Sequence, residues 1–75
     1  MPHIVIKLWP GRTEEEKKSM AQAVVDAAVE HLHAEPGWVS VGIEEVDEDR
    51  WNDDVFRPEI LAKRDTLYAV CDELK

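Results

Sequence analysis

The sequence is poor in cysteine, because Cys71 is the only one among its 75 residues. An intrachain disulfide is therefore excluded, and the lack of paired cysteines predicts a reducing, cytoplasmic compartment. None of the three histidines has a cysteine partner or the HExxH spacing of a zinc site. We therefore expect no metal centre.

Long apolar runs are missing as well. No stretch approaches the roughly 18 apolar residues that a membrane-spanning helix requires. No basic segment followed by an apolar stretch opens the chain, so a signal peptide is not expected either.

Basic residues are few. Nine lysines and arginines stand against seventeen aspartates and glutamates, which gives a net charge of −8. This balance disfavours nucleic acid and anionic membranes as partners. It also repels small anionic substrates, so a site for one of them needs a local cation.

The chain is short for a self-sufficient core. A protein of this size hides only about 60% of the surface that its unfolded chain exposes. Domains below about 80 residues usually rely on disulfides, a metal or association with other chains. With the first two excluded, we predict one domain over residues 1–75 that forms a homo-oligomer.

The pattern along the chain predicts a strand, a helix and a second strand. Residues 3–9 alternate between two faces, and Pro10-Gly11 ends the run. Thr13 and Glu16 form the T-x-x-E pattern of a capping box, which predicts a helix that Pro36-Gly37 stops. Its predicted apolar arc contains Met20, Ala21, Val24, Val25, Ala27, Ala28, His31 and Leu32, so His31 is expected to be a core histidine.

The second strand is expected from residue 39, with Val39, Val41 and Ile43 on one face. Strand, helix and strand in this order favour a parallel crossover, an α/β (α+β) fold built on one β-α-β unit. Residues 47–54 are polar and predict turns, after which Pro58 is expected to open a helical tail. The sheet face opposite the helix carries apolar side chains that a partner chain would cover, namely Val5, Trp9 and Trp38.

Position 2 is the first residue that points to chemistry. Removal of the initiator methionine is favoured before a small residue, and Pro2 would then carry a secondary amine. An α-amino group has a pKa of about 7.7–8.0, which burial or a nearby cation would lower toward the range of a general base at pH 7. The alternative is that Pro2 simply follows the start codon.

The sequence resembles the 4-oxalocrotonate tautomerase family, in particular its longer, dimer-forming bacterial members that begin Met-Pro-His-Ile. The matching segments are M-P-H-I-V-I-K at 1–7, P-G-R-T at 10–13, the E-E-K-K start of the helix, V-S-V-G-I-E-E-V at 39–46, and Trp51. The resemblance implies a cofactor-independent keto-enol tautomerase in which the Pro2 amine shuttles a proton on a 2-oxo acid or its enol. It favours a dimer over a hexamer.

The resemblance also assigns substrate-binding residues. Arg12 matches the arginine that binds a substrate carboxylate, and Trp51 matches the aromatic wall of the pocket. Ser40 stands where the founding members carry a second arginine, which Arg50, Arg57, Lys7 or a backbone N–H could replace. One arginine and several tryptophans suit a monoacid such as an aryl-substituted enolpyruvate better than a dicarboxylate. His3 is expected to have a supporting role at most.

Other interpretations remain open. Arg12 could be a solvated turn residue, and Trp51 could pack structurally against the sheet. A relative that hydrates or dehalogenates unsaturated acids would need a carboxylate to activate water, for which Glu44, Glu45 or Asp47 are available. A non-catalytic assembly protein of the same fold is the third reading, and the missing second arginine is its main support.

Overall fold

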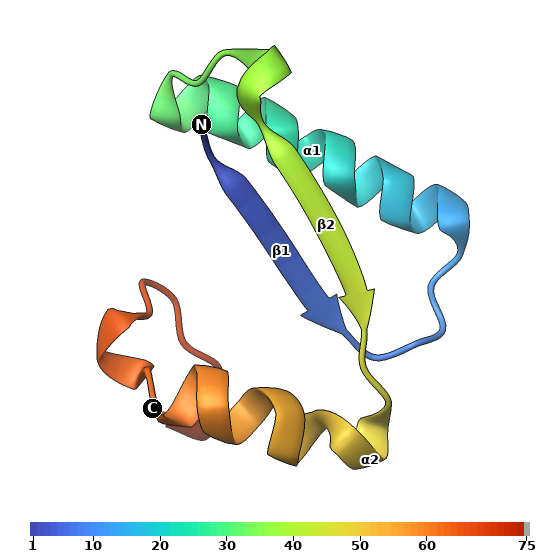
Figure 1. The fold of residues 1–75 in the computed structure, drawn as a ribbon, viewed down its shortest axis with the longest axis vertical. Coiled ribbons are helices and arrows are strands. Elements are labelled where there is room, and N and C mark those ends of the chain that lie inside the picture. Colours follow the sequence, from blue (N-terminus) through green and yellow to red (C-terminus); the bar gives the residue numbers. More distant parts are fainter. Residues whose placement is uncertain (75) are drawn as a thin grey trace. The chain divides into compact units, whose positions relative to one another are not determined.

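A computed structural model describes residues 1–74, and Figure 1 shows its elements. The chain forms two compact units, Met1–Glu45 and the segment from Val46 onward. The single domain over residues 1–75 stays a prediction.

The first unit is the expected β-α-β unit. Strand β1 (His3–Leu8) pairs in parallel with β2 (Ser40–Glu45), in a register that runs from His3 opposite Ser40 to Leu8 opposite Glu45. Helix α1 (Glu14–Leu32) connects the strands and runs along one face of the sheet (Figure 1). This architecture confirms the fold predicted from the alternating and helical periods.

The sheet has one face toward α1 and one open face. Ile6 and its partner Ile43 line a cavity together with side chains of α1, so they belong to the helix side. Val5 and Gly42 share the opposite face, where a Cβ on Gly42 would lie 4.0 Å from Val5 Cγ2. Val5 is 43% exposed, and Trp9 and Trp38, which lie outside the two strands, are 44% and 60% exposed. Apolar surface of this extent fits a face that association covers.

Helix α1 buries a narrower stripe than predicted. The half-buried or buried apolar positions follow the i, i+3, i+4, i+7, i+8 pattern, namely Ala21, Val24, Val25, Ala28 and Val29. The expected core position of His31 is wrong, because its side chain is 73% exposed. Met20 and Leu32 are also exposed, at 50% and 65%. Two strands about 4.8 Å apart cover only part of the apolar arc.

The ends of α1 are defined by local hydrogen bonds. Thr13 Oγ1 accepts from Glu16 N–H at 3.1 Å, and Glu16 Oε1 accepts from Thr13 N–H at 2.9 Å, which confirms the capping box. The helix ends at Leu32, earlier than expected, because His33 adopts a left-handed conformation with φ of 58° and terminates it. A 3₁₀ turn, Pro36–Trp38, then leads into β2.

Loss of the capping box should destabilise the protein in a pH-dependent way. The hydrogen bond from Thr13 N–H lowers the pKa of Glu16 below its ordinary value. The stability from ionised Glu16 is therefore complete above the unfolded pKa of about 4.3 and is lost as pH falls through the lower folded pKa. We expect Thr13→Ala to lower the unfolding free energy by about 1 kcal/mol at pH 7. Chemical denaturation measures this, with Thr66→Ala as a control outside α1.

When chemical denaturation is repeated at a series of pH values, the difference in unfolding free energy between wild type and Glu16→Gln should shrink as pH falls below about 4.3. A difference that stays constant from pH 7 to pH 3 would contradict the role of the ionised Glu16 carboxylate.

The second unit differs from the prediction. Residues expected as turns form α2 (Glu48–Trp51), which continues into the π-helix η2 (Asn52–Leu61). Arg50 pairs with Asp54 at 2.9 Å and Arg57 with Asp53 at 3.5 Å, both at i, i+4 spacing. These pairs make the polar run a solvated helix face, which is why the expectation of turns was wrong.

Pro58 was expected to open a helix, but it lies inside η2, and the expected helical tail is not formed over 62–74. Proline has no N–H and crowds the preceding helical turn, and a wider π-turn relieves that crowding. Ala62 N–H accordingly bonds the carbonyl of Arg57 at 3.0 Å, five residues back. Beyond η2 the described chain has only the short 3₁₀ turns Arg64–Thr66 and Asp72–Leu74.

Almost none of the described chain is fully buried. Ala28, at 5% exposed, and Val55, at 4%, are its only buried apolar residues. This agrees with the expectation that a chain of this length needs a partner to complete its core.

Candidate active site

Pro2 lies at the entrance of β1, beside the start of β2. Its carbonyl oxygen accepts a hydrogen bond from Ser40 N–H at 3.2 Å, which fixes the residue against the second strand. Pro2 is half-buried, whereas Met1 is 84% exposed.

Ser40 brings a second residue to this end of the sheet. Its hydroxyl Oγ lies 2.6 Å from His3 Nδ1, a short hydrogen bond between side chains that share the open face. The structure therefore gathers Pro2, His3 and Ser40 at one place. The parallel register, which sets His3 opposite Ser40, is the signal that brings these two side chains together.

Arg12 lies at the other end of β1, in the turn before α1. Gly11, directly before it, has φ of +127°, a conformation that favours glycine and turns the chain toward the helix. Six strand residues separate the Pro2 end from the Arg12 turn, which corresponds to roughly 20 Å. One chain therefore does not bring Pro2 and Arg12 together.

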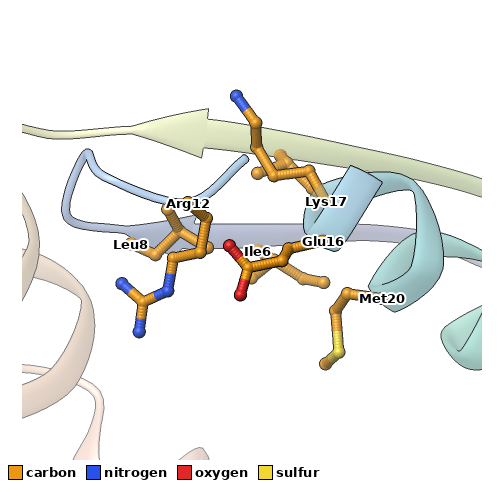
Figure 2. Close-up of a pocket in the computed structure, with 7 residues that line it drawn as sticks. Ile6, Leu8, Arg12, Glu16, Lys17 and Met20 are labelled. Carbon is orange, nitrogen blue, oxygen red and sulfur yellow. The ribbon is translucent and has the colours of Figure 1, made fainter. Parts of the chain in front are cut away.

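The guanidinium of Arg12 is available to bind a ligand. Within residues 1–74 it makes no hydrogen bond or ion pair, although its charge contributes to the lowered pKa of Glu16. It borders a cavity of about 270 Å³ between the sheet and the start of α1. Figure 2 shows the Arg12 guanidinium and the Glu16 carboxylate directed to the same side, and the Lys17 amine directed away from them. The other lining side chains are apolar, namely Ile6, Leu8, Met20 and Ile43.

Several other cations are already engaged by carboxylates. Lys7 pairs with Glu44 at 3.7 Å, and Lys17 pairs with Glu14 at 2.8 Å and with Glu45 at 3.6 Å. The hydrogen bond with Glu14 raises the pKa of Lys17 and lowers the pKa of Glu14.

The basic residues of the second unit are engaged in the same way. The hydrogen bond with Asp54 raises the pKa of Arg50, and Arg57 pairs with Asp53. Lys7, Arg50 and Arg57, the side chains considered as replacements for the second arginine, thus each have an acidic partner.

Trp51 belongs to the second unit, where it is half-buried and ends α2. Metal ligands do not gather anywhere in residues 1–74, since no group of three or more histidine, cysteine, aspartate or glutamate side chains could hold an ion there. A search of these residues also finds no helix long and apolar enough to cross a membrane.

Comparisons with known proteins identify the family of the chain. Residues 2–54 match the Tautomerase family of tautomerase enzymes. Tautomerase PptA of Pectobacterium carotovorum subsp. carotovorum (strain PC1) is 38% identical over 68 residues, which cover 89% of this chain and 90% of the relative. A probable tautomerase of Xylella fastidiosa (strain 9a5c) is 32% identical over 60 residues, covering 80% of this chain and 73% of the relative.

A solved structure has the same fold. TomN, a 4-oxalocrotonate tautomerase homologue of the tomaymycin biosynthetic pathway, superposes with a TM-score of 0.65 at 34% identity, covering 67% of this chain and 77% of TomN. The chain belongs to the Tautomerase family, and it is an isomerase with the fold of the 4-oxalocrotonate tautomerases.

Proposed function

We propose that the protein catalyses cofactor-independent keto-enol tautomerisation of a 2-oxo acid, with the Pro2 amine as general base and proton shuttle once Met1 is removed. The observation that carries this proposal is the position of Pro2, half-buried at the start of β1 and held by Ser40 N–H, in a chain whose residues 2–54 match a tautomerase family. The exposure of Met1 leaves its peptide bond open to an aminopeptidase.

The chemistry requires a base that is neutral at working pH. A free α-amino group titrates at about 7.7–8.0, and partial burial lowers the pKa of an amine because it disfavours the charged form. The neutral Pro2 amine would take the enol proton and return it to carbon, or act in the reverse direction. A general base of this kind contributes about 10²- to 10⁴-fold in rate.

Arg12 is proposed to bind the substrate carboxylate. Its guanidinium is available, and its planar fork suits a carboxylate in a chain of net charge −8. Because one chain keeps Arg12 about a strand length from Pro2, Arg12 of a second copy would complete the site. Two copies related by a two-fold axis and joined along the same strand edge run antiparallel, which sets the Pro2 end of one copy near the Arg12 end of the other.

Ser40 and Trp51 are proposed to complete the pocket. The Ser40 hydroxyl would donate to the substrate, and the Trp51 indole would exclude water from the amine. Of the arginines considered for this site, Arg50 and Arg57 have acidic partners in the described part of the chain and Arg12 has none there. One arginine fits one carboxylate, so we propose an aryl-substituted enolpyruvate as substrate. The proposed assembly is a homodimer, favoured over a hexamer, and the lone Cys71 supports a cytoplasmic location.

Ultraviolet absorbance of phenylenolpyruvate provides the direct test. Met1-free protein, verified by mass, is expected to accelerate its ketonisation. Absence of acceleration together with hydration of an unsaturated acid would favour the hydratase or dehalogenase alternative, in which a protonated Pro2 acts as an acid. Inactivity toward both classes of substrate would favour a non-catalytic assembly protein.

A mixing experiment tests the shared site. One impaired variant retains Met1 and has Arg12, and the other impaired variant has a free Pro2 amine and carries Arg12→Gln. When dimers are refolded from an equal mixture, half of them contain one copy of each variant. Each such dimer has one intact site of two, so about a quarter of wild-type activity should return. No recovery in mixtures that form mixed dimers by mass spectrometry would contradict a site shared between copies.

A further inference from the structure

We propose that His3 is a positioning residue that fixes the Ser40 hydroxyl as the neutral hydrogen-bond donor of the active site. This inference rests on the proposed tautomerase function. It starts from the 2.6 Å contact between His3 Nδ1 and Ser40 Oγ and from the hydrogen bond of Ser40 N–H to Pro2. One residue of β2 thereby links the base and the histidine.

The reaction needs a donor near the base. Moving a proton between carbon and oxygen of a 2-oxo acid builds negative charge on the enol oxygen, and a fixed donor stabilises that charge. Lys7, the cation on the same sheet face as His3 and Ser40, pairs with Glu44 at the far end of the strands. The Ser40 hydroxyl lies at the Pro2 end of that face, so it is the side-chain donor that the register brings to the base.

His3 determines which way the Ser40 proton points. A hydroxyl has one proton to donate, and it can accept further hydrogen bonds through its oxygen. When Nδ1 carries a proton, His3 donates to Oγ, and the Ser40 proton remains available for a substrate oxygen. Without a proton on Nδ1, Ser40 donates to His3 instead and has none left for the substrate. The expected state of the working site is therefore His3 with its proton on Nδ1.

This arrangement also fits the proposed preference for monoacids. A hydroxyl that accepts from an imidazole offers a directed donor without the fixed positive charge of an arginine. It would stabilise the enol oxygen of a substrate whose carboxylate Arg12 binds, and it would offer little to a second carboxylate.

The test compares variants of both residues in Met1-free protein with phenylenolpyruvate. We expect Ser40→Ala to lower kcat by on the order of 100-fold, as loss of a transition-state donor does, with a smaller change in KM. His3→Leu should lower kcat about tenfold by leaving the hydroxyl unoriented. His3→Asn, whose amide can still donate at the same reach, should retain kcat within about threefold. His31→Asn, at an exposed histidine of α1, is the matched control.

A double-mutant cycle separates positioning from a structural role. If His3 acts through Ser40, His3→Leu should change kcat by less than about twofold in the Ser40→Ala background. Circular dichroism and oligomer mass are recorded for each variant, and Ser40→Thr keeps a hydroxyl in case Ser40→Ala does not fold.

Two results would overturn the inference while leaving the proposed function intact. One is an active wild type whose kcat is unchanged by folded His3→Leu and Ser40→Ala. The other is an equal effect of His3→Leu with and without the serine. An inactive wild type would instead overturn the proposed function.

Discussion

Protein that retains Met1 should ketonise phenylenolpyruvate at least 100-fold more slowly than protein that begins at Pro2. With Met1 present, the Pro2 nitrogen is a tertiary amide whose lone pair is delocalised into the carbonyl, so it cannot accept a proton. Loss of a general base lowers the rate by about 10²- to 10⁴-fold. The measurement is the decay of enol absorbance, on protein whose N-terminal state is established by mass spectrometry.

The matched control comes from a single preparation. Protein retaining Met1 is divided, and one half is trimmed with an aminopeptidase, which the 84% exposure of Met1 should permit. Both halves then differ only in Met1 and come from the same purification. Equal rates before and after trimming would show that the Pro2 amine is not the working base, even if the protein is active.

Arg12→Gln is the second change with a large expected effect. A charge-assisted hydrogen bond contributes about 1.5–3 kcal/mol, so its loss should lower kcat/KM by about 10- to 100-fold. Arg64→Gln removes the same charge from an exposed residue in the second unit and is the control for net charge. Steady-state kinetics at low ionic strength would measure both variants, because a general effect of charge would then appear in both.

A neutral substrate makes the Arg12 prediction specific. The methyl ester of the enol lacks the carboxylate that Arg12 is proposed to bind, so wild type and Arg12→Gln should process it at similar rates. An equally large loss on the acid and on the ester would contradict carboxylate binding. It would point instead to a structural role for the turn that contains Gly11 and Arg12.

The first unit could be predicted because its signals are local. Strand alternation over 3–9 and the reciprocal Thr13–Glu16 pattern each depend on residues a few positions apart, and both are present in the structure. The parallel pairing followed from the order of the elements. The exposed position of His31 could not be read in this way, because the width of the sheet limits how much of the apolar arc of α1 is covered.

The second unit was harder to predict because local composition and helix formation disagree there. Acidic residues and Asn52 are typical of turns, yet Arg50 and Arg57 compensate Asp54 and Asp53 one helical turn away. Pro58 is typical of a helix start, and a π-turn accommodates it inside the helix instead. Such compensation depends on which residues face one another after the helix has formed.

The sequence by itself determined the β-α-β unit, the capping of α1, the need for a partner and the family, because periodicity, short-range hydrogen bonding and chain length are properties of the linear chain. Only the tertiary structure decided which candidate residues meet. The strand register sets His3 against Ser40 and fixes Ser40 N–H on Pro2, and the length of β1 keeps Arg12 at the opposite end. The physical reason is that pairing in a sheet depends on contacts between residues 37 positions apart, which no local pattern records.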